Sequence, residues 1–93
     1  MMSMQKQLHV FYSGKVQGIG FRYTVADIAN QQKVCGWIKN LIDSRVEVVA
    51  IADEDTLNNF LKSVKEHFSH YIGDCNIEWL PVSRKFSDFQ IIF

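Results

Sequence analysis

The stretch LHVFYSGKVQGIGFRYTVADIAN, residues 8–30, decides the fold because its hydrophobic pattern changes at a glycine-containing loop. Leu8–Ser13 alternates along the chain with a period of two, which predicts a β-strand. From Phe21 onward, apolar residues recur at i, i+4, i+7 and i+8, the spacing that places one stripe of a helix against a core. The sequence therefore predicts a strand, a loop and a helix in direct succession.

The remaining segments extend this unit into a complete domain. Val34–Asn40 and Val46–Ala52 predict a second and a third strand, joined by a hairpin turn at Asp43 and Ser44. A second amphipathic helix is predicted around Leu57, Phe60, Leu61, Val64 and Phe68, followed by extended segments at Asn76–Val82 and Phe89–Phe93. The order β-α-β-β-α-β predicts one α+β domain over residues 1–93, a ferredoxin-like sandwich with two helices on one face of a mostly antiparallel sheet.

Composition restricts the class of function. The chain has 93 residues, 47% of them hydrophobic, and its 10 basic residues balance 10 acidic ones. Without the broad positive field of nucleic-acid or anionic-membrane binders, an anion site here should be local and suited to a small ligand. No stretch predicts a signal sequence or a membrane span, so we expect a cytoplasmic protein. Cys35 and Cys75 are too few for a disulfide scaffold, and we expect unpaired thiols.

The loop Gly14–Arg22 has the composition of an anion cradle. It holds three glycines in its first seven positions, so its backbone can curl and point successive N–H groups at one anion in front of a helix N-terminus. Arg22 lies in the first turn of that helix, where a cation is unfavourable unless an anion accompanies it. From the residues alone, a solvated arginine beside a flexible turn remains the simpler interpretation.

Two motifs resemble those of a known family. Residues 14–22, GKVQGIGFR, resemble the acylphosphatase signature G-x-V-Q-G-V-x-F-R, with Ile19 in place of a valine. Residues 36–40, GWIKN, resemble the second acylphosphatase motif, G-W-V-x-N. The resemblance implies hydrolysis of acyl phosphates to a carboxylate and inorganic phosphate by a metal-independent enzyme.

The resemblance also assigns roles to individual residues. It implies that Arg22 binds the phosphoryl group and that Asn40 orients the attacking water. The backbone of the loop would hold the phosphoryl oxygens, through Gln17, Gly18, Ile19, Gly20 and Phe21. We expect no metal or organic cofactor, no nucleic-acid or membrane partner, and a monomer whose site also accepts inorganic phosphate or sulfate. Apart from the motif, an asparagine at the end of a strand is ordinarily a turn residue.

Two positions depart from the family pattern. Ser44 stands at a turn position where the family commonly has glycine, and if this position needs a positive φ the cost is about 1 kcal/mol. The turn would then adjust and shift Asn40 slightly. Lys33 stands near the end of the first helix where the family often has glycine, so we expect this helix to end without the usual left-handed cap.

Three alternatives remain open at this point. A ferredoxin-like RNA-binding module would stack bases on exposed sheet aromatics such as Phe11 and Tyr12. A non-catalytic anion sensor would use the same cradle without turnover. His67 and His70, three residues apart, could share a metal, but no third ligand is evident and surface histidines are the simpler interpretation.

Overall fold

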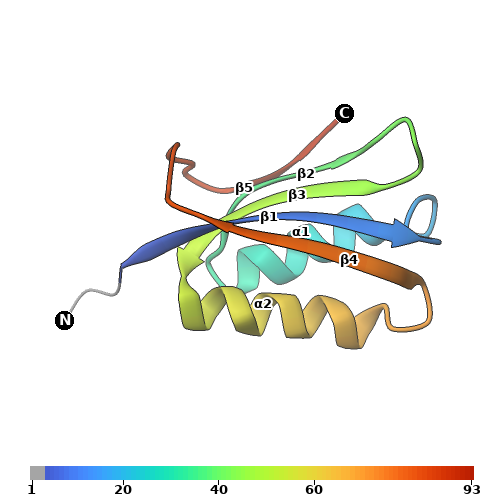
Figure 1. Cartoon of the computed structure of the whole chain (residues 1–93), viewed down its shortest axis with the longest axis horizontal. Coiled ribbons are helices and arrows are strands. Elements are labelled where there is room, and N and C mark those ends of the chain that lie inside the picture. Colours follow the sequence, from blue (N-terminus) through green and yellow to red (C-terminus); the bar gives the residue numbers. More distant parts are fainter. Residues whose placement is uncertain (1–3) are drawn as a thin grey trace.

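The computed structural model describes residues 4–93, which form a five-stranded sheet with two helices on one side of it (Figure 1). In chain order the elements are β1 (Gln5–Gly14), α1 (Phe21–Gln31), β2 (Cys35–Asn40), β3 (Val46–Asp53), α2 (Glu54–His67), β4 (Ile72–Leu80) and β5 (Phe89–Ile92). The predicted ferredoxin-like α+β architecture is confirmed.

The sheet order is β4-β1-β3-β2-β5, which places β1 and β3 next to each other near the centre. Neighbouring strands are antiparallel except for β2 and β5, which run parallel with Gly36 opposite Phe89. The predicted hairpin joins β2 to β3, with Asn40 opposite Val46 at its closed end. The loop after β1 and the end of β2 therefore lie at the same end of the sheet.

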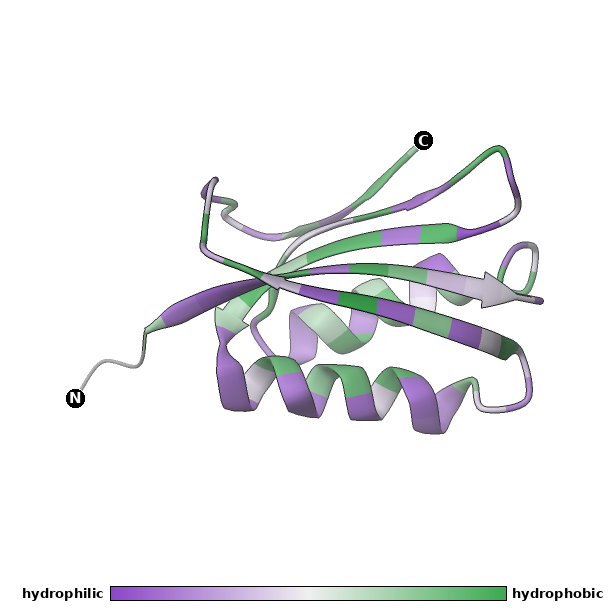
Figure 2. Ribbon diagram, in the orientation of Figure 1, coloured by the Kyte–Doolittle hydropathy of each residue, from purple (hydrophilic) through white to green (hydrophobic). Residues whose placement is uncertain are grey.

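The core lies between the sheet and the helices. Alternate residues of β1, Leu8, Val10 and Tyr12, are almost fully buried against it, as the two-residue period predicts. Figure 2 shows the hydrophobic residues of α2 turned toward the sheet and the hydrophilic ones turned away, and α1 also buries one apolar side that includes Phe21, Val25 and Ala29. Within residues 4–93, no helix is long and apolar enough to cross a membrane.

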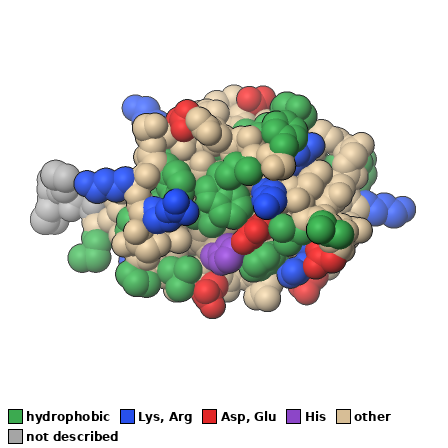
Figure 3. Space-filling model, turned by 90° about the horizontal axis from the view of Figure 1, so that it is seen from above, with side chains coloured by type: hydrophobic (Ala, Val, Ile, Leu, Met, Phe, Trp, Pro, Cys, Tyr) green, Lys and Arg blue, Asp and Glu red, His purple; other side chains and the backbone are tan. Residues whose placement is uncertain are grey.

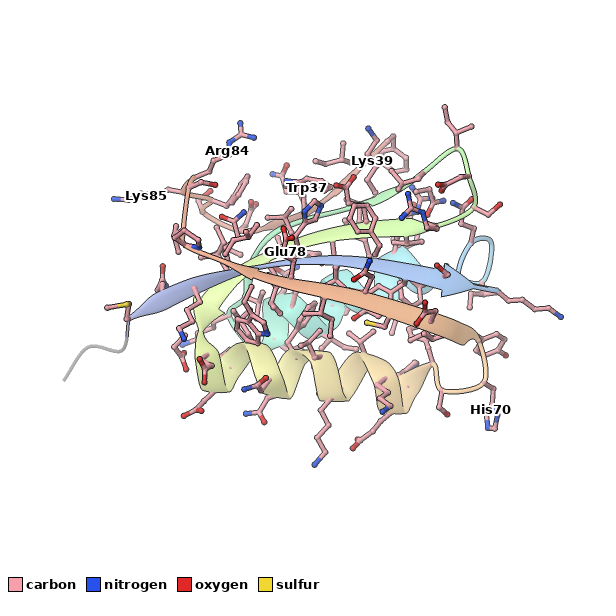
Figure 4. All side chains as sticks on the ribbon, in the orientation of Figure 1. Trp37, Lys39, His70, Glu78, Arg84 and Lys85 are labelled. Carbon is pink, nitrogen blue, oxygen red and sulfur yellow. The ribbon has the colours of Figure 1, made fainter. Side chains whose placement is uncertain are left out.

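The other side of the sheet, which we call the open face, carries hydrophobic side chains among charged ones of both signs (Figure 3). Trp37, Lys39 and Glu78 point to this side (Figure 4). Phe11 is half-buried there, with the Arg45 guanidinium 4.6 Å from its ring centroid. Tyr12 is only 2% exposed on the opposite face, because successive strand residues point to opposite faces. The RNA-binding alternative, which needs both aromatics exposed on the sheet, therefore lacks Tyr12.

Helix α1 ends differently from the expectation. Lys33 adopts a left-handed conformation with φ 59°, and the Val34 N–H donates to the Ala29 carbonyl at 2.8 Å. The Lys33 N–H donates to the carbonyl of Asn30 at 3.3 Å. These two bonds and the burial of Val34 against the helix form a Schellman motif, so the left-handed cap is retained although lysine replaces glycine.

The predicted strand Asn76–Val82 is correct in type but displaced. β4 begins earlier, at Ile72, because its pairing with β1 extends to Gly14, and it ends at Leu80, opposite Gln7. Where these two strand ends pair, Gly14 and Gly73 approach so closely that a Cβ on Gly14 would overlap the Gly73 backbone. Local hydrophobicity does not report such a contact between distant segments.

Candidate functional site

The loop between β1 and α1 has the backbone shape that its glycines predict. Gly18 and Gly20 both have φ 79°, on either side of Ile19, and a Cβ at either glycine would meet no atom within 4 Å. Glycine is therefore favoured here by backbone conformation and not by crowding. Alternation of left- and right-handed residues forms a concave array of N–H groups of the kind that holds anions.

The N–H groups of this array are free to bind a ligand. Among residues 4–93, no backbone hydrogen bond outside helices and strands is donated by an N–H of residues 17–22. Gly20 caps α1 without a side-chain bond, and the first turn of the helix holds no acidic residue. The positive end of the α1 dipole thus lacks a carboxylate from its own first turn, which favours an external anion.

Three anchors fix the loop to the rest of the fold. The Lys15 N–H donates to the Tyr71 carbonyl at 2.8 Å, and the side chain of Val16 is fully buried in the core. The Gln17 side-chain amide donates to the carbonyls of Leu41 and Arg45, each at 2.9 Å. Gln17 therefore connects the loop to the β2–β3 turn, and its side chain is not directed at a ligand.

The turn itself is a short hairpin loop with a left-handed residue. The Ser44 N–H donates to the Leu41 carbonyl at 3.3 Å, and the Leu41 N–H donates to the Arg45 carbonyl at 2.8 Å. Ser44 has φ 79°, the conformation that this three-residue loop requires at a position usually occupied by glycine. The Arg45 backbone N–H and guanidinium bind the Asp43 carboxylate and lower its pKa.

A pocket of about 170 Å³ lies where the loop, the start of α1 and the end of β2 meet. It is lined by Val16, Gly18, Gly20, Phe21, Arg22, Tyr23 and Asn40. Organic ligands of drug size occupy pockets of about 300 to 1,000 Å³, so this one suits a group of phosphoryl size. The two motifs, 13 residues apart in the chain, are brought together here.

Arg22 and Asn40 reach the pocket from different elements. The half-buried Arg22 projects from the first turn of α1, and no hydrogen bond or ion pair to its side chain is present within residues 4–93. Asn40 is the last residue of β2, and its Oδ1 is buried without a hydrogen-bond partner in the described part of the chain. A cation with free donors and an asparagine side chain therefore line one small pocket.

The structure separates the predicted site residues into two groups. Gly18, Gly20 and Phe21 line the pocket with Arg22 and Asn40. Ile19 is 38% exposed and is not among the lining residues, and Gln17 faces the hairpin. Their backbone N–H groups remain candidates.

Val16 and Tyr23 also line the pocket, and neither is among the site residues predicted from the sequence. Val16 could have been found as an apolar residue inside a polar, glycine-containing loop. Tyr23 is 60% exposed and directly follows the motif, and nothing in the sequence marks it as a residue of the site.

Other candidate groups lie away from this pocket. His67 ends α2 and its ring lies tilted against that of Phe68, with 4.8 Å between ring centroids, whereas His70 lies beyond it in the turn before β4 (Figure 4). Both cysteines are free, and two strands, β1 and β3, lie between Cys35 on β2 and Cys75 on β4. A larger hollow of about 560 Å³ lies between α2 and β4, but none of the predicted site residues lines it.

Comparisons with known proteins find relatives of this chain. The family model described as Acylphosphatase matches residues 8–91. The acylphosphatase of Treponema denticola is 40% identical over 87 residues, which cover 92% of each chain. The acylphosphatase of Staphylococcus haemolyticus is 40% identical in an alignment of 94 positions, which covers 95% of this chain and 98% of that one. The crystal structure of acylphosphatase from Bacillus subtilis superposes with a TM-score of 0.88 at 35% identity, over 97% of this chain and all of that chain.

Proposed function

Because the chain belongs to the acylphosphatase family and is a hydrolase, we propose that it hydrolyses an acyl phosphate in the pocket between Arg22 and Asn40. The products would be a carboxylate and inorganic phosphate. The observation that carries the proposal is the meeting of the free Arg22 guanidinium, the Asn40 side chain and a cradle of free N–H groups around a pocket of about 170 Å³.

The cradle and Arg22 would bind the phosphoryl group together. Backbone N–H groups of residues 17–21 donate to its oxygens, and the N-terminus of α1 adds the favourable end of a dipole. The planar guanidinium of Arg22 supplies a bidentate donor that follows the charge as it develops in the transition state. All of these contacts are made to the phosphoryl group, which is the group that reacts.

Asn40 would hold the attacking water. The Asn40 carboxamide lines the pocket, and it has an Oδ1 that can accept a hydrogen bond from that water and an Nδ2 that can donate to a phosphoryl oxygen. The amide therefore fixes the distance and direction of the water relative to phosphorus. Such positioning lowers the entropic part of the activation barrier, because the two reactants are already held together before they react.

The reaction then proceeds without a base from the protein. The water oxygen forms a bond to phosphorus as the bond from phosphorus to the acyl oxygen breaks, and the electron pair of that bond leaves with the carboxylate. A water proton passes to a phosphoryl oxygen of the substrate. Because a carboxylate is a good leaving group, positioning and charge stabilisation are sufficient.

A kinetic assay with benzoyl phosphate tests this proposal. The wild-type protein should release benzoate and phosphate at the same rate with and without a chelator, and Arg22→Ala should lower kcat/KM at least 100-fold. Phosphate binding without turnover by the wild-type protein would instead identify a non-catalytic anion sensor. Full activity in Arg22→Ala would exclude the role given to this arginine.

A further inference from the structure

The guanidinium of Arg22 lies over an aromatic ring from the other end of the chain. Its Cζ is 5.0 Å from the ring centroid of Phe93, within the range of a cation–π contact. Neither signature motif includes Phe93, and it is not among the residues that line the pocket. The contact therefore adds a neighbour to Arg22 without filling the space for the phosphoryl group.

The sheet register explains how Phe93 reaches this position. β5 runs parallel to β2 with Ile92 opposite Lys39, so Phe93 follows directly beside Asn40. Phe89 and Ile91 face the helices and pack into or against the core, and the two-residue period turns Phe93 to the same side. Parallel pairing thus brings one ring to the strand end that carries Asn40 and toward α1.

This ring can restrain Arg22 without competing with substrate. An arginine side chain loses much rotamer freedom when it is fixed, so an arginine restrained beforehand binds an anion at lower entropic cost. A carboxylate partner would restrain it too, but would occupy the N–H donors that the phosphoryl oxygens need. An aromatic face attracts the cation and leaves those donors available.

We propose that Phe93 is a positioning residue that holds the Arg22 guanidinium in its phosphoryl-binding orientation through this cation–π contact. The inference rests on the proposed function of Arg22. It adds a residue outside both motifs to the machinery that recognises the phosphoryl group. Phe93 is 84% exposed, so a change there removes little of the core.

The test compares Phe93→Leu, which keeps apolar bulk but removes the ring, with Phe93→Tyr, which keeps the ring. Phe93→Leu should raise both the KM for benzoyl phosphate and the inhibition constant of inorganic phosphate about three- to fivefold. Phe93→Tyr should keep both constants within about twofold of the wild-type values. A loss of ring-current shift at the Arg22 Nε–H resonance in Phe93→Leu would report the lost contact directly.

Phe86→Leu is the matched control, because the Phe86 ring lies 5.8 Å from the Arg84 Cζ, and neither residue lines the pocket. It should leave both constants at wild-type values. Wild-type constants in Phe93→Leu, or equal changes in both leucine variants, would overturn the inference. If Arg22→Ala abolishes hydrolysis while Phe93→Leu changes nothing, only this inference fails; an inactive wild-type protein would contradict the proposed function itself.

Discussion

The side-chain amide of Gln17 donates a hydrogen bond of 2.9 Å to the carbonyl oxygen of Leu41, the residue that follows Asn40. A second bond of 2.9 Å from the same amide reaches the carbonyl of Arg45, on the other side of the turn. One side chain therefore joins the proposed phosphoryl cradle to the turn beside the proposed water-binding residue. The distance between the cradle and Asn40 therefore depends on the Gln17 side chain.

Gln17→Leu should consequently affect both stability and catalysis. Loss of two half-buried bonds should lower the free energy of unfolding by about 1 to 3 kcal/mol. The altered spacing of cradle and Asn40 should lower kcat about tenfold. Urea unfolding and steady-state kinetics measure the two effects.

Gln32→Leu is the control for this change, since its amide bonds the Ser63 hydroxyl at 2.9 Å between the two helices and lines no part of the site. It should lower stability and leave kcat unchanged. A normal kcat in Gln17→Leu would show that the turn holds its position without this amide.

Asn40→Ala should separate catalysis from binding. Removal of the amide that holds the water should lower kcat about 100-fold or more, because a bound water in random orientations attacks rarely. The inhibition constant of inorganic phosphate should change less than about threefold, since the cradle and Arg22 remain. Asn76→Ala, at an exposed position on β4, should leave both constants unchanged. Equal losses of phosphate affinity and kcat in Asn40→Ala would assign Asn40 to binding instead.

Glycine at the two strained positions should stabilise the protein. Ser44 and Lys33 have φ values of 79° and 59°, which side chains with a Cβ adopt at a cost. Ser44→Gly and Lys33→Gly should each raise the free energy of unfolding by up to about 1 kcal/mol, or Tm by roughly 4 to 8 °C. Ser44→Ala keeps the Cβ and should give no gain. Equal Tm values for Ser44→Ala and Ser44→Gly would contradict this account.

Asp53→Ala should destabilise α2 in a pH-dependent way. The Asp53 carboxylate caps α2 by accepting from the Thr56 hydroxyl at 2.6 Å and its N–H at 3.1 Å, and these bonds lower the pKa of Asp53. A lowered pKa in the folded state stabilises the protein above about pH 4, and this stability is lost as pH falls through the folded-state pKa.

The urea midpoint of Asp53→Ala should therefore lie well below that of the wild type at pH 7 and approach it at pH 2. Asp55→Ala removes a charge from the same helix turn without removing a cap bond, so its midpoint should fall less at pH 7. A midpoint difference for Asp53→Ala that stays constant across this pH range would exclude the ionised cap as its cause.

Most of the fold follows from local periodicity in the sequence. The alternation in Leu8–Ser13 and the helical stripe from Phe21 predict β1 and α1, and the turn residues predict the hairpin. The end of α1 is less predictable because the propensity of Lys33 opposes the left-handed cap that it forms. There the tertiary contact of Val34 with the core outweighs local preference.

The site is less accessible to sequence reasoning than the fold. The two motifs mark Arg22 and Asn40, but neither motif shows that the Gln17 side chain turns away from the pocket to bind the hairpin. Phe93 gives no local signal either, because its position depends on the parallel pairing of β5 with β2. Such long-range contacts appear only when the whole sheet is assembled.

The hydrogen bond from Lys15 to Tyr71 has a consequence for how activity is acquired during refolding. Arg22 and Asn40 belong to the first half of the chain, yet the loop in front of them is held by a carbonyl from the second half. A refolding intermediate with β1, α1 and the first hairpin formed would still lack this restraint. Hydrolysis should therefore return only when the second half of the chain has also folded, and an enzyme assay can time the completion of the native state.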